Sequence, residues 1–391
     1  MKTFLSLFAW LLALSGLHAE EDYLALAQKA ISRAGDNAAE LQKAIDLAPT
    51  EQKNGMAFLI AYMPESDLTS LKADFLLENA KWAYKARAEL PWAKNIPEDV
   101  FLNDVLPYAS LNERRDNWRQ DFHQRFSKHV AGKTTLLEAI KAVNASIQDE
   151  VKVDYSTQRK KPDQSPYESM EINMASCTGL SILLTDAFRS VGIPSRVSGI
   201  PAWTTKRGNH NWVEVWTSPE KTWQFTEYYP DGKGLDHGWL LADAAQANPK
   251  SLYHSIYSSS WKPTNSHFPL VWDLKNKDVH AVNVSDYYIQ LGGANKDAAK
   301  NSCELRIEFL DKQGQRISVP VSVTQADTKI GTGNTPKPID DMNRYLTIPV
   351  KRGQIYTLSW TPPGTEKPQT KQIKTEAKDA WLVQTLKLKA E

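Results

Sequence analysis

The sequence predicts an α+β protein with a helical N-terminal region, a mixed central domain and a C-terminal β-sandwich. This prediction depends on a change of hydrophobic period along the chain. Apolar residues recur every three or four positions up to about residue 150 and every second position after about residue 275. Between these regions, one strong helix is followed by alternating strands. Of the 391 residues, 41% are hydrophobic and 24% are charged, which is typical of a globular protein.

The chain begins with a stretch typical of a secretory signal peptide. Lys2 supplies a positive charge, the apolar run FLSLFAWLLAL follows it, and Ala19 is a small residue at the expected cleavage position. The run is too short to span a bilayer, and no later segment is long and apolar enough to do so. We therefore predict a signal peptide over residues 1–19 and a secreted or periplasmic protein without stable membrane insertion.

Residues 20–134 are expected to form a helical domain. YLALAQKAISRAG and NAAELQKAIDLAP carry apolar residues at helical spacing, and Gly35 and Pro49 end these two segments. LTSLKADFLLENAKWAYKARAEL continues the pattern up to Pro91. After one more helical segment, LEAIKAVNASI, the polar stretch VDYSTQRKKPDQSPYES indicates a long loop. We expect this loop, 154–169, to contribute to substrate binding, because long loops in compact proteins often carry function.

The clearest helix of the chain starts at a cysteine, in SCTGLSILLTDAFRSVGIPSRV. Ser176 suits the N-cap position, Gly192 suits the position after the last turn, and Pro194 prevents continuation. Cys177 then lies at the first helical position, where free backbone amides and the helix dipole favour a thiolate and would hold an oxyanion. Taken alone, a nucleophile and a structural role, such as a disulfide with Cys303, are about equally supported.

A histidine, His210, begins the predicted strand HNWVEVW, which comes after the helix of Cys177 in the chain. If a four-residue turn connects it to the next strand, KTWQFTEYYP, then Trp216 pairs with Lys221 and His210 lies directly opposite Glu227. Glu227 would accept a hydrogen bond from one ring nitrogen and leave the other to face a thiol. The simpler alternative is an ordinary histidine beside a surface glutamate. The cysteine favours the first interpretation, because the three groups then have complementary roles.

Together these motifs resemble the transglutaminase-like fold, a circularly related cousin of papain-type cysteine proteases. The resemblance covers about 135–245 and depends on SCTG opening a helix that ends in GIPSRV, on the pattern H-x-W-x-E, and on the acidic residue of WQFTE. It implies a catalytic core over 135–270, with Cys177 as nucleophile, His210 as general base and acid, and Glu227 as orienting carboxylate. The family usually has aspartate at the third place, so Glu227 departs from its pattern.

Five further residues are weaker candidates for the oxyanion site or the cleft. Asn173 is a candidate oxyanion donor, and Trp212 is expected to pack beneath the histidine. In PDGKGLDHGW, Asp231, Asp236 and His237 could replace Glu227 or line the cleft. A turn followed by a solvent-exposed loop is the preferred interpretation of these residues. Glu214 is expected to be structural, as the partner of a salt bridge or hydrogen bond. The five weaker candidates are Asn173, Thr178, Trp212, Asp236 and His237.

Neither a cofactor nor a metal is expected. Two cysteines and scattered histidines do not make a zinc site, and the sequence has no glycine-rich phosphate loop. The 47 basic and 46 acidic residues nearly balance, so nothing indicates a nucleic-acid partner. The 13 tryptophans suit either a well-filled core or contact with a glycan.

Residues 275–391 are expected to form the β-sandwich, because short strands separated by turns are typical of that fold. The strands expected there are VHAVNVSDYYIQL, CELRIEFL, RISVPVSV, RYLTIPV and IYTLSW.

The sequence thus predicts an exported thiol hydrolase or acyl transferase that acts on peptide or amide bonds through a thioester at Cys177. Hydrolysis is preferred, because the resemblance to exported members implies proteases or amidases more than crosslinking enzymes. The expected substrate is a protein or peptide, in the cell wall or the extracellular space. The alternative is a weakly active or inactive binding protein for a cell-surface glycan or peptide, which the departure at Glu227 would fit.

Overall fold

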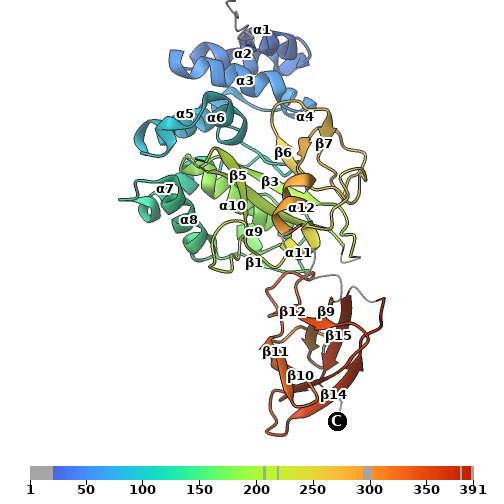
Figure 1. Cartoon of the computed structure of the whole chain (residues 1–391). Helices are drawn as coiled ribbons and strands as arrows, with labels where there is room; N and C mark the ends of the chain where they lie inside the picture. Colours follow the sequence, from blue (N-terminus) through green and yellow to red (C-terminus); the bar gives the residue numbers. More distant parts are fainter. Residues whose placement is uncertain (1–20, 206–207, 218–219, 294–301, 379–380, 389–391) are drawn as a thin grey trace, which may run out of the picture.

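The computed structural model shows three parts that follow one another along the chain: N-terminal helices, a central domain around a six-stranded sheet, and a C-terminal β-sandwich (Figure 1). The α+β class and this arrangement confirm the prediction from the sequence. The signal peptide predicted over 1–19 lies outside the described residues. The structure describes residues 21–205, 208–217, 220–293, 302–378 and 381–388.

The N-terminal part is built from amphipathic helices that bury one face each. In α5 this face is rich in alanine, which lets neighbouring helices approach closely. The last helix, α8, begins with a capping box in which Thr135 and Glu138 bond each other's backbone amides. The helices are α1 Tyr23–Ile31, α2 Ala38–Leu47, α3 Lys53–Tyr62, α4 Glu65–Leu68, α5 Ala73–Glu89, α6 Glu98–Asp104, α7 Arg119–Val130 and α8 Leu136–Val151.

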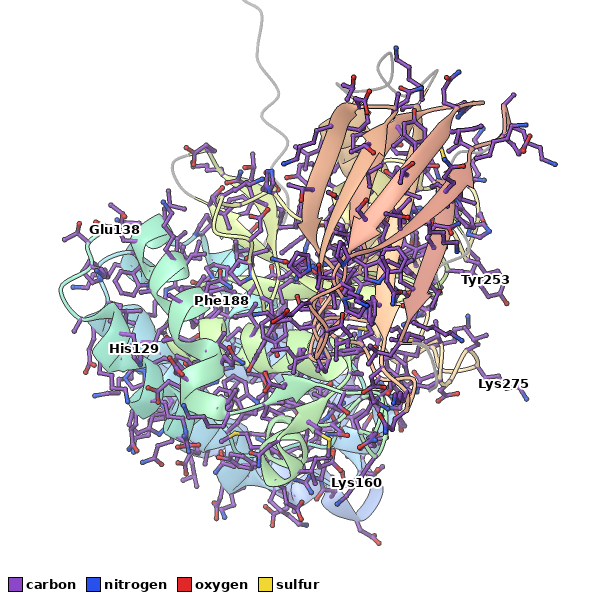
Figure 2. All side chains as sticks on the ribbon, turned by 90° about the horizontal axis from the view of Figure 1, so that it is seen from below. His129, Glu138, Lys160, Phe188, Tyr253 and Lys275 are labelled. Carbon is purple, nitrogen blue, oxygen red and sulfur yellow. The ribbon has the colours of Figure 1, made fainter. Side chains whose placement is uncertain are left out.

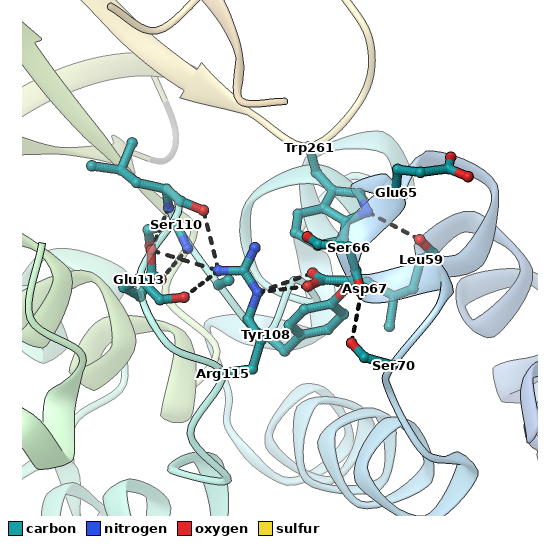
Figure 3. A network of polar contacts seen from close by, with 12 residues as sticks. Leu59, Glu65, Ser66, Asp67, Ser70, Tyr108, Ser110, Glu113, Arg115 and Trp261 are labelled. Atoms are coloured by element: carbon teal, nitrogen blue, oxygen red, sulfur yellow. Dashed lines mark hydrogen bonds and ion pairs between the residues drawn. The ribbon is translucent and has the colours of Figure 1, made fainter. Parts of the chain in front are cut away.

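A buried ion-pair network ties α4 to the segment that precedes α7 (Figure 3). The Arg115 guanidinium donates to both carboxylate oxygens of Asp67, at 3.2 and 2.9 Å, and Tyr108 donates its hydroxyl to the same carboxylate at 2.8 Å. The Glu113 carboxylate accepts from the amides of Ser110 and Leu111. These bonds fix an irregular segment against the helices, because buried charges require partners.

The central domain is organised around α10, Cys177–Ser190, which lies between the sheet and the helices α7 and α8. Its residues from Thr178 to Ser190 are all buried, and Phe188 lies inside the domain whereas Tyr253 lies at its edge (Figure 2). The helix ends where Gly192 adopts a φ of 69°. A side chain there would also meet Ala93, at 2.7 Å between the β carbons.

The central sheet has the strand order β5-β4-β3-β6-β8-β7, and all its pairs are antiparallel. A two-stranded parallel pair, β1 with β2, lies directly before α10. The strands are β1 Asp154–Tyr155, β2 Met174–Ala175, β3 Ser195–Ile200, β4 His210–Thr217, β5 Thr222–Thr226, β6 Tyr257–Ser260, β7 Ser266–His267 and β8 His280–Asn283. The short helices are α9 Pro166–Ile172, α11 Leu241–Ala244 and α12 Ser285–Gly293.

Two expectations from the sequence are wrong in this part. The expected long loop ends in a helix, α9, because Ser165 and Glu168 form a capping box and Pro166 occupies the first turn. The stretch VHAVNVSDYYIQL is not the first sandwich strand. Its first half is β8 of the central sheet, and its second half is the helix α12, which buries Tyr288 against Trp212.

The C-terminal part is a sandwich of a four-stranded sheet, β11-β10-β13-β14, and a three-stranded sheet, β12-β9-β15. Its own core holds Cys303, and neither Cys303 nor Cys177 forms a disulfide. The disulfide considered from the sequence is therefore wrong: the two cysteines lie in different domains. The strands are β9 Ser302–Leu310, β10 Pro320–Gln325, β11 Thr328–Asn334, β12 Leu346–Lys351, β13 Ile355–Trp360, β14 Gln369–Lys374 and β15 Trp381–Lys387.

Across the described ranges, none of the helices is both long and apolar enough to cross a membrane.

Candidate active site

Cys177 is the first residue of α10. The Ser176 hydroxyl caps this helix by accepting a hydrogen bond from the Gly179 amide at 3.1 Å. The side chain of Cys177 is partly exposed, whereas the residues that follow it in α10 are buried. A thiol at this position faces a pocket, and the first amides of the helix are available to bind a developing negative charge.

The strands β4 and β5 bring a histidine and a glutamate together, although in a different register from the one expected. Trp216 pairs with Trp223, two residues further than the predicted partner Lys221. Glu227 therefore lies diagonal to His210, on the same face of the sheet. The Oε1 atom of Glu227 accepts a hydrogen bond from His210 Nε2 at 3.0 Å. The predicted register is wrong by two residues, and an even slip keeps both side chains on one face.

Trp239 was missed by the sequence reasoning, and it holds the glutamate in place. Its indole nitrogen donates to the same Oε1 atom of Glu227 at 3.0 Å, and its ring lies 4.8 Å from that of His210. A side chain at Gly238 would come within 3.0 Å of the other carboxylate oxygen, so the backbone can approach only as glycine. Trp239 follows β5 in an irregular segment without periodicity, so no local pattern marked it.

We expect replacement of Glu227 by glutamine to lower kcat for hydrolysis of an amide substrate by about 10²–10⁴-fold. The neutral amide cannot stabilise a positively charged His210 ring. Steady-state kinetics checks this, with circular dichroism to verify folding. Glu171→Gln, on the exposed side of α9, is the matched control that should keep full activity. Full activity in both variants would show that Glu227 does not orient the histidine.

Asp341 brings a second carboxylate to the histidine, from the sandwich domain. Its Oδ2 atom lies 3.4 Å from His210 Nδ1, the ring nitrogen that Glu227 leaves free. The Cys177 sulfur, a ring nitrogen of His210 and a carboxylate oxygen of Asp341 all lie within 4.8 Å of one another. The sequence reasoning missed Asp341, because the only local signal in PIDDMNRY is that of an Asx turn, in which Asp341 Oδ1 accepts from the Asn343 amide.

Burial and mutual attraction shift the pKa values of His210 and Asp341. Burial by itself lowers the pKa of His210, but the charge of Asp341 and hydrogen bonds to Asp341, Cys177 and Glu227 outweigh it, and the pKa lies well above 6.5. Burial raises the pKa of Asp341, but attraction to His210 and hydrogen bonding to Asn343 lower it below its usual value. An imidazolium and a carboxylate are the favoured forms.

This ion pair makes the stability of the protein depend on pH. The contribution of His210 is fully present below its usual pKa of 6.5 and is lost as the pH rises through the higher folded value. The contribution of Asp341 is present above 3.8 and is lost as the pH falls. We expect the difference in Tm between wild type and Asp341→Asn to be largest between about pH 4 and 6.5 and to shrink at higher pH. Thermal unfolding in EDTA-containing buffers checks this, and a constant difference would contradict it.

A small pocket is lined by Cys177 and His210, and a larger groove lies next to it. The pocket at the sulfur has a volume of about 40 Å³, so it admits only a few water molecules. It shares lining residues with a groove of about 480 Å³ that is lined by both the central domain and the sandwich. The lining of both hollows includes Glu227, Tyr229, Trp239, Asp340 and Arg344. The segment between β11 and β12, residues 335–345, which we call the 335–345 loop, contributes Asp340, Asp341 and Arg344 to the lining of the pocket at the sulfur.

The weaker candidates take mostly structural positions. Asn173 ends α9 with a φ of 54°, and its exposed side chain lies beside the Lys152 and Met170 carbonyls. It does not line the pocket at the sulfur. Thr178 is buried and donates to the Asn211 side chain at 2.9 Å.

Asp236 accepts hydrogen bonds from the Phe225 amide, the Gln224 side chain and the Tyr287 hydroxyl, which fixes β5 against α12. His237 pairs with Asp231 in the lining of the groove. Neither of the two contacts His210 or Glu227 through a hydrogen bond that the described residues show.

Two further residues of β4, Trp212 and Glu214, stabilise the strand that carries His210. Trp212 is buried, stacks on Trp203 with ring centres 6.0 Å apart, and donates to the Tyr288 hydroxyl at 2.7 Å. Its ring lies 5.8 Å from that of His210. Glu214 forms a buried salt bridge with Arg196 at 2.7 Å, which confirms its predicted structural role.

Comparison with known proteins gives the fold family of this part of the chain. Residues 124–243 match the profile of the transglutaminase-like superfamily. No curated protein sequence matches the chain.

Two of the solved structures that match this chain illustrate the low similarity. One, "a Putative Cysteine Protease from Cytophaga hutchinsonii", is 16% identical with a TM-score of 0.28, over 38% of this chain and 50% of its own. The other, a red sea bream transglutaminase, is 11% identical with a TM-score of 0.28, over 76% of this chain and 59% of its own. This chain thus spans about half of the first of these structures.

Proposed function

Residues 124–243 belong to the transglutaminase-like superfamily, and from this premise we propose that the protein is a thiol hydrolase acting on peptide or amide bonds. The observation that carries the proposal is the meeting of three groups. The Cys177 sulfur lies within 4.8 Å of a His210 ring nitrogen, and His210 Nε2 donates to Glu227 at 3.0 Å. Nucleophile, base and orienting carboxylate therefore stand in the order that covalent catalysis requires.

The proposed reaction has two steps. The Cys177 sulfur attacks the carbonyl carbon of the substrate while His210 holds the thiol proton, and the amides at the start of α10 stabilise the oxyanion. The C–N bond breaks, the leaving amine takes the proton from His210, and a thioester remains. A water molecule, deprotonated by His210, then attacks the thioester, releases the acid and restores the thiol. An amine in place of water would give transamidation, the second acyl-transfer outcome.

The substrate class is supported by the groove between the two domains. Its volume of about 480 Å³ suits an extended peptide segment that reaches the sulfur from the side of Tyr229 and Trp239. With the signal-like stretch at 1–19, we propose that the enzyme is exported and acts on a protein or peptide of the cell wall or the extracellular space.

The alternative is a binding protein for a cell-surface peptide or glycan. The observation that favours it is the small volume of the pocket at Cys177, about 40 Å³, which the 335–345 loop helps to line. A pocket of this size leaves little room for a substrate carbonyl, so a protein that does not widen it would bind in the groove without turnover.

Alkylation and acyl trapping test the two against each other. We expect iodoacetamide to modify Cys177 much faster than Cys303, which is buried in the sandwich core. With a peptide-library substrate, rapid acid quench and mass spectrometry should detect an acyl group on the peptide that contains Cys177. Slow and equal labelling of both cysteines, with no acyl adduct, would support the binding protein.

A further inference from the structure

We propose that Cys177, His210 and Asp341 form a binding site for a divalent transition metal, zinc in the first place, which closes the catalytic thiol off from substrate. The site would join the central domain to the sandwich, because two of the ligands come from α10 and β4 and the third comes from the 335–345 loop. The loss of activity on metal binding rests on the proposed function, whereas the binding itself does not.

The spacing of the three ligand atoms is close to that of a zinc site. Zn–N and Zn–O bonds of about 2.0–2.2 Å at a tetrahedral angle place the two atoms about 3.4 Å apart. Asp341 Oδ2 and His210 Nδ1 are separated by 3.4 Å. With Zn–S near 2.3 Å, the sulfur must lie about 3.6 Å from the other ligands. Since all three atoms lie within 4.8 Å, the largest adjustment is about one ångström.

Two of these atoms are buried and face each other beside the thiol. The His210 side chain is 4% exposed and that of Asp341 is 10% exposed. His210 Nδ1 and Asp341 Oδ2 pair with each other at 3.4 Å, and among the described residues no further donor or acceptor of normal hydrogen-bond geometry reaches either atom. A buried pair at this separation, beside a thiol, has the donor atoms and the spacing to hold a metal ion between them.

The outer contacts hold each ligand as metal sites require. Glu227 accepts from His210 Nε2, so Nδ1 is the nitrogen that would bind the metal once its proton is lost, and Trp239 fixes the glutamate. A histidine that binds a metal through one nitrogen almost always donates its other N–H to a carboxylate or carbonyl. Here Glu227 would accept from His210 both when the histidine acts in catalysis and when it binds a metal.

Asp341 is restrained in the same way. Its Oδ1 atom accepts from the Asn343 amide at 2.8 Å, so only Oδ2 is available, as a monodentate ligand. Arg316 donates to the backbone carbonyls of Asp341 and Met342 at 2.8 and 2.7 Å. The Asn343 side chain donates to the carbonyl of Asn209, next to His210, at 2.8 Å. The loop therefore presents its carboxylate to the histidine from a fixed backbone.

The chemistry of the ligands selects the metal. One thiolate, one imidazole and one carboxylate suit zinc, whereas magnesium and calcium prefer oxygen ligands alone. Three protein ligands leave the fourth tetrahedral position to water. Binding requires the sulfur as thiolate and Nδ1 without its proton, so each proton that these two atoms carry passes to solvent, and the metal then holds the sulfur and nitrogen that the hydrolytic reaction uses.

The test uses the full-length protein after removal of metals with a chelator. Titration with Zn²⁺ alone is expected to show one tight site per chain by calorimetry, and one equivalent of zinc should remain after desalting. Replacement of zinc with Co²⁺ should give the visible bands of a tetrahedral site and a thiolate-to-cobalt charge-transfer band. Zinc should also protect Cys177 from iodoacetamide. These readouts do not require the protein to be an active hydrolase.

Single substitutions identify which residues bind the metal. Asp341→Asn should weaken zinc binding by more than about tenfold, and Cys177→Ala should abolish the charge-transfer band. Asp340→Asn is the matched control, because the neighbouring carboxylate is already paired with Arg344 at 2.8 Å and should not change the affinity. If Asp341→Asn does not fold, the cobalt spectrum of the wild-type protein decides. No stoichiometric zinc and no charge-transfer band would overturn the proposal, even if the hydrolase is active.

Discussion

Replacing Cys177 with alanine is expected to lower the rate of amide hydrolysis by at least about 10⁴-fold, because no other nucleophile can form the thioester. The methyl side chain fits the first position of α10, so the fold and the affinity for substrate should be retained. We expect Kd for the peptide to change by less than about threefold. Single-turnover kinetics and calorimetry measure the two quantities on the same preparation.

Cys303→Ala is the matched control for this experiment. It removes the other thiol of the chain, which lies in the sandwich core, and should lower the stability modestly while leaving the rate per folded molecule unchanged. Turnover that persists in Cys177→Ala would exclude the thioester route. Equal binding by both proteins without turnover by wild type would indicate the binding protein instead.

Replacing Arg115 with alanine is expected to have the largest effect on stability, about 3–5 kcal/mol in the free energy of unfolding. The arginine donates to both oxygens of Asp67 and to the carbonyls of Leu111 and Glu113. The side chain of Asp67 is 6% exposed, so its charge would be left buried without its main partner (Figure 3). Chemical denaturation followed by circular dichroism measures the change.

The control for Arg115→Ala is Arg33→Ala, in the same helical part of the chain. Arg33 pairs with Glu65 at 3.6 Å, but both side chains are more than half exposed, so its loss should cost less than about 1 kcal/mol. Equal effects of the two substitutions would show that the buried network does not hold α4 against the segment before α7.

Local patterns were sufficient for the parts of the site that depend on one element. Ser176 before Cys177 and Gly192 after the last turn set both ends of α10, and the alternation in HNWVEVW set the face on which His210 lies. The pairing of β4 with β5 was predicted two residues out of register, because the connection of four residues was placed one residue too early: Thr217 pairs with Thr222, and β4 extends through Thr217. In both registers Glu227 lies on the same face of the sheet as His210, so it still reaches the histidine.

Patterns were misleading where tertiary contacts decide. DYYIQL has the β propensity of a strand but forms α12, because Tyr288 finds Trp212 and Glu214 as partners for its hydroxyl in the central domain. The start of α9 carries a capping box, Ser165 with Glu168, which a closer reading of the loop would have found.

The sequence by itself determined the class of fold, the helix that begins at Cys177 and the three groups of the proposed reaction, since each depends on residues close together or on strands joined by one turn. Only the tertiary structure decided that Asp341 meets His210 and that Trp239 holds Glu227. Asp341 lies 131 positions beyond the histidine, in another domain. Periodicity and turn chemistry act over a few residues, whereas contacts between domains depend on how two completed surfaces fit together.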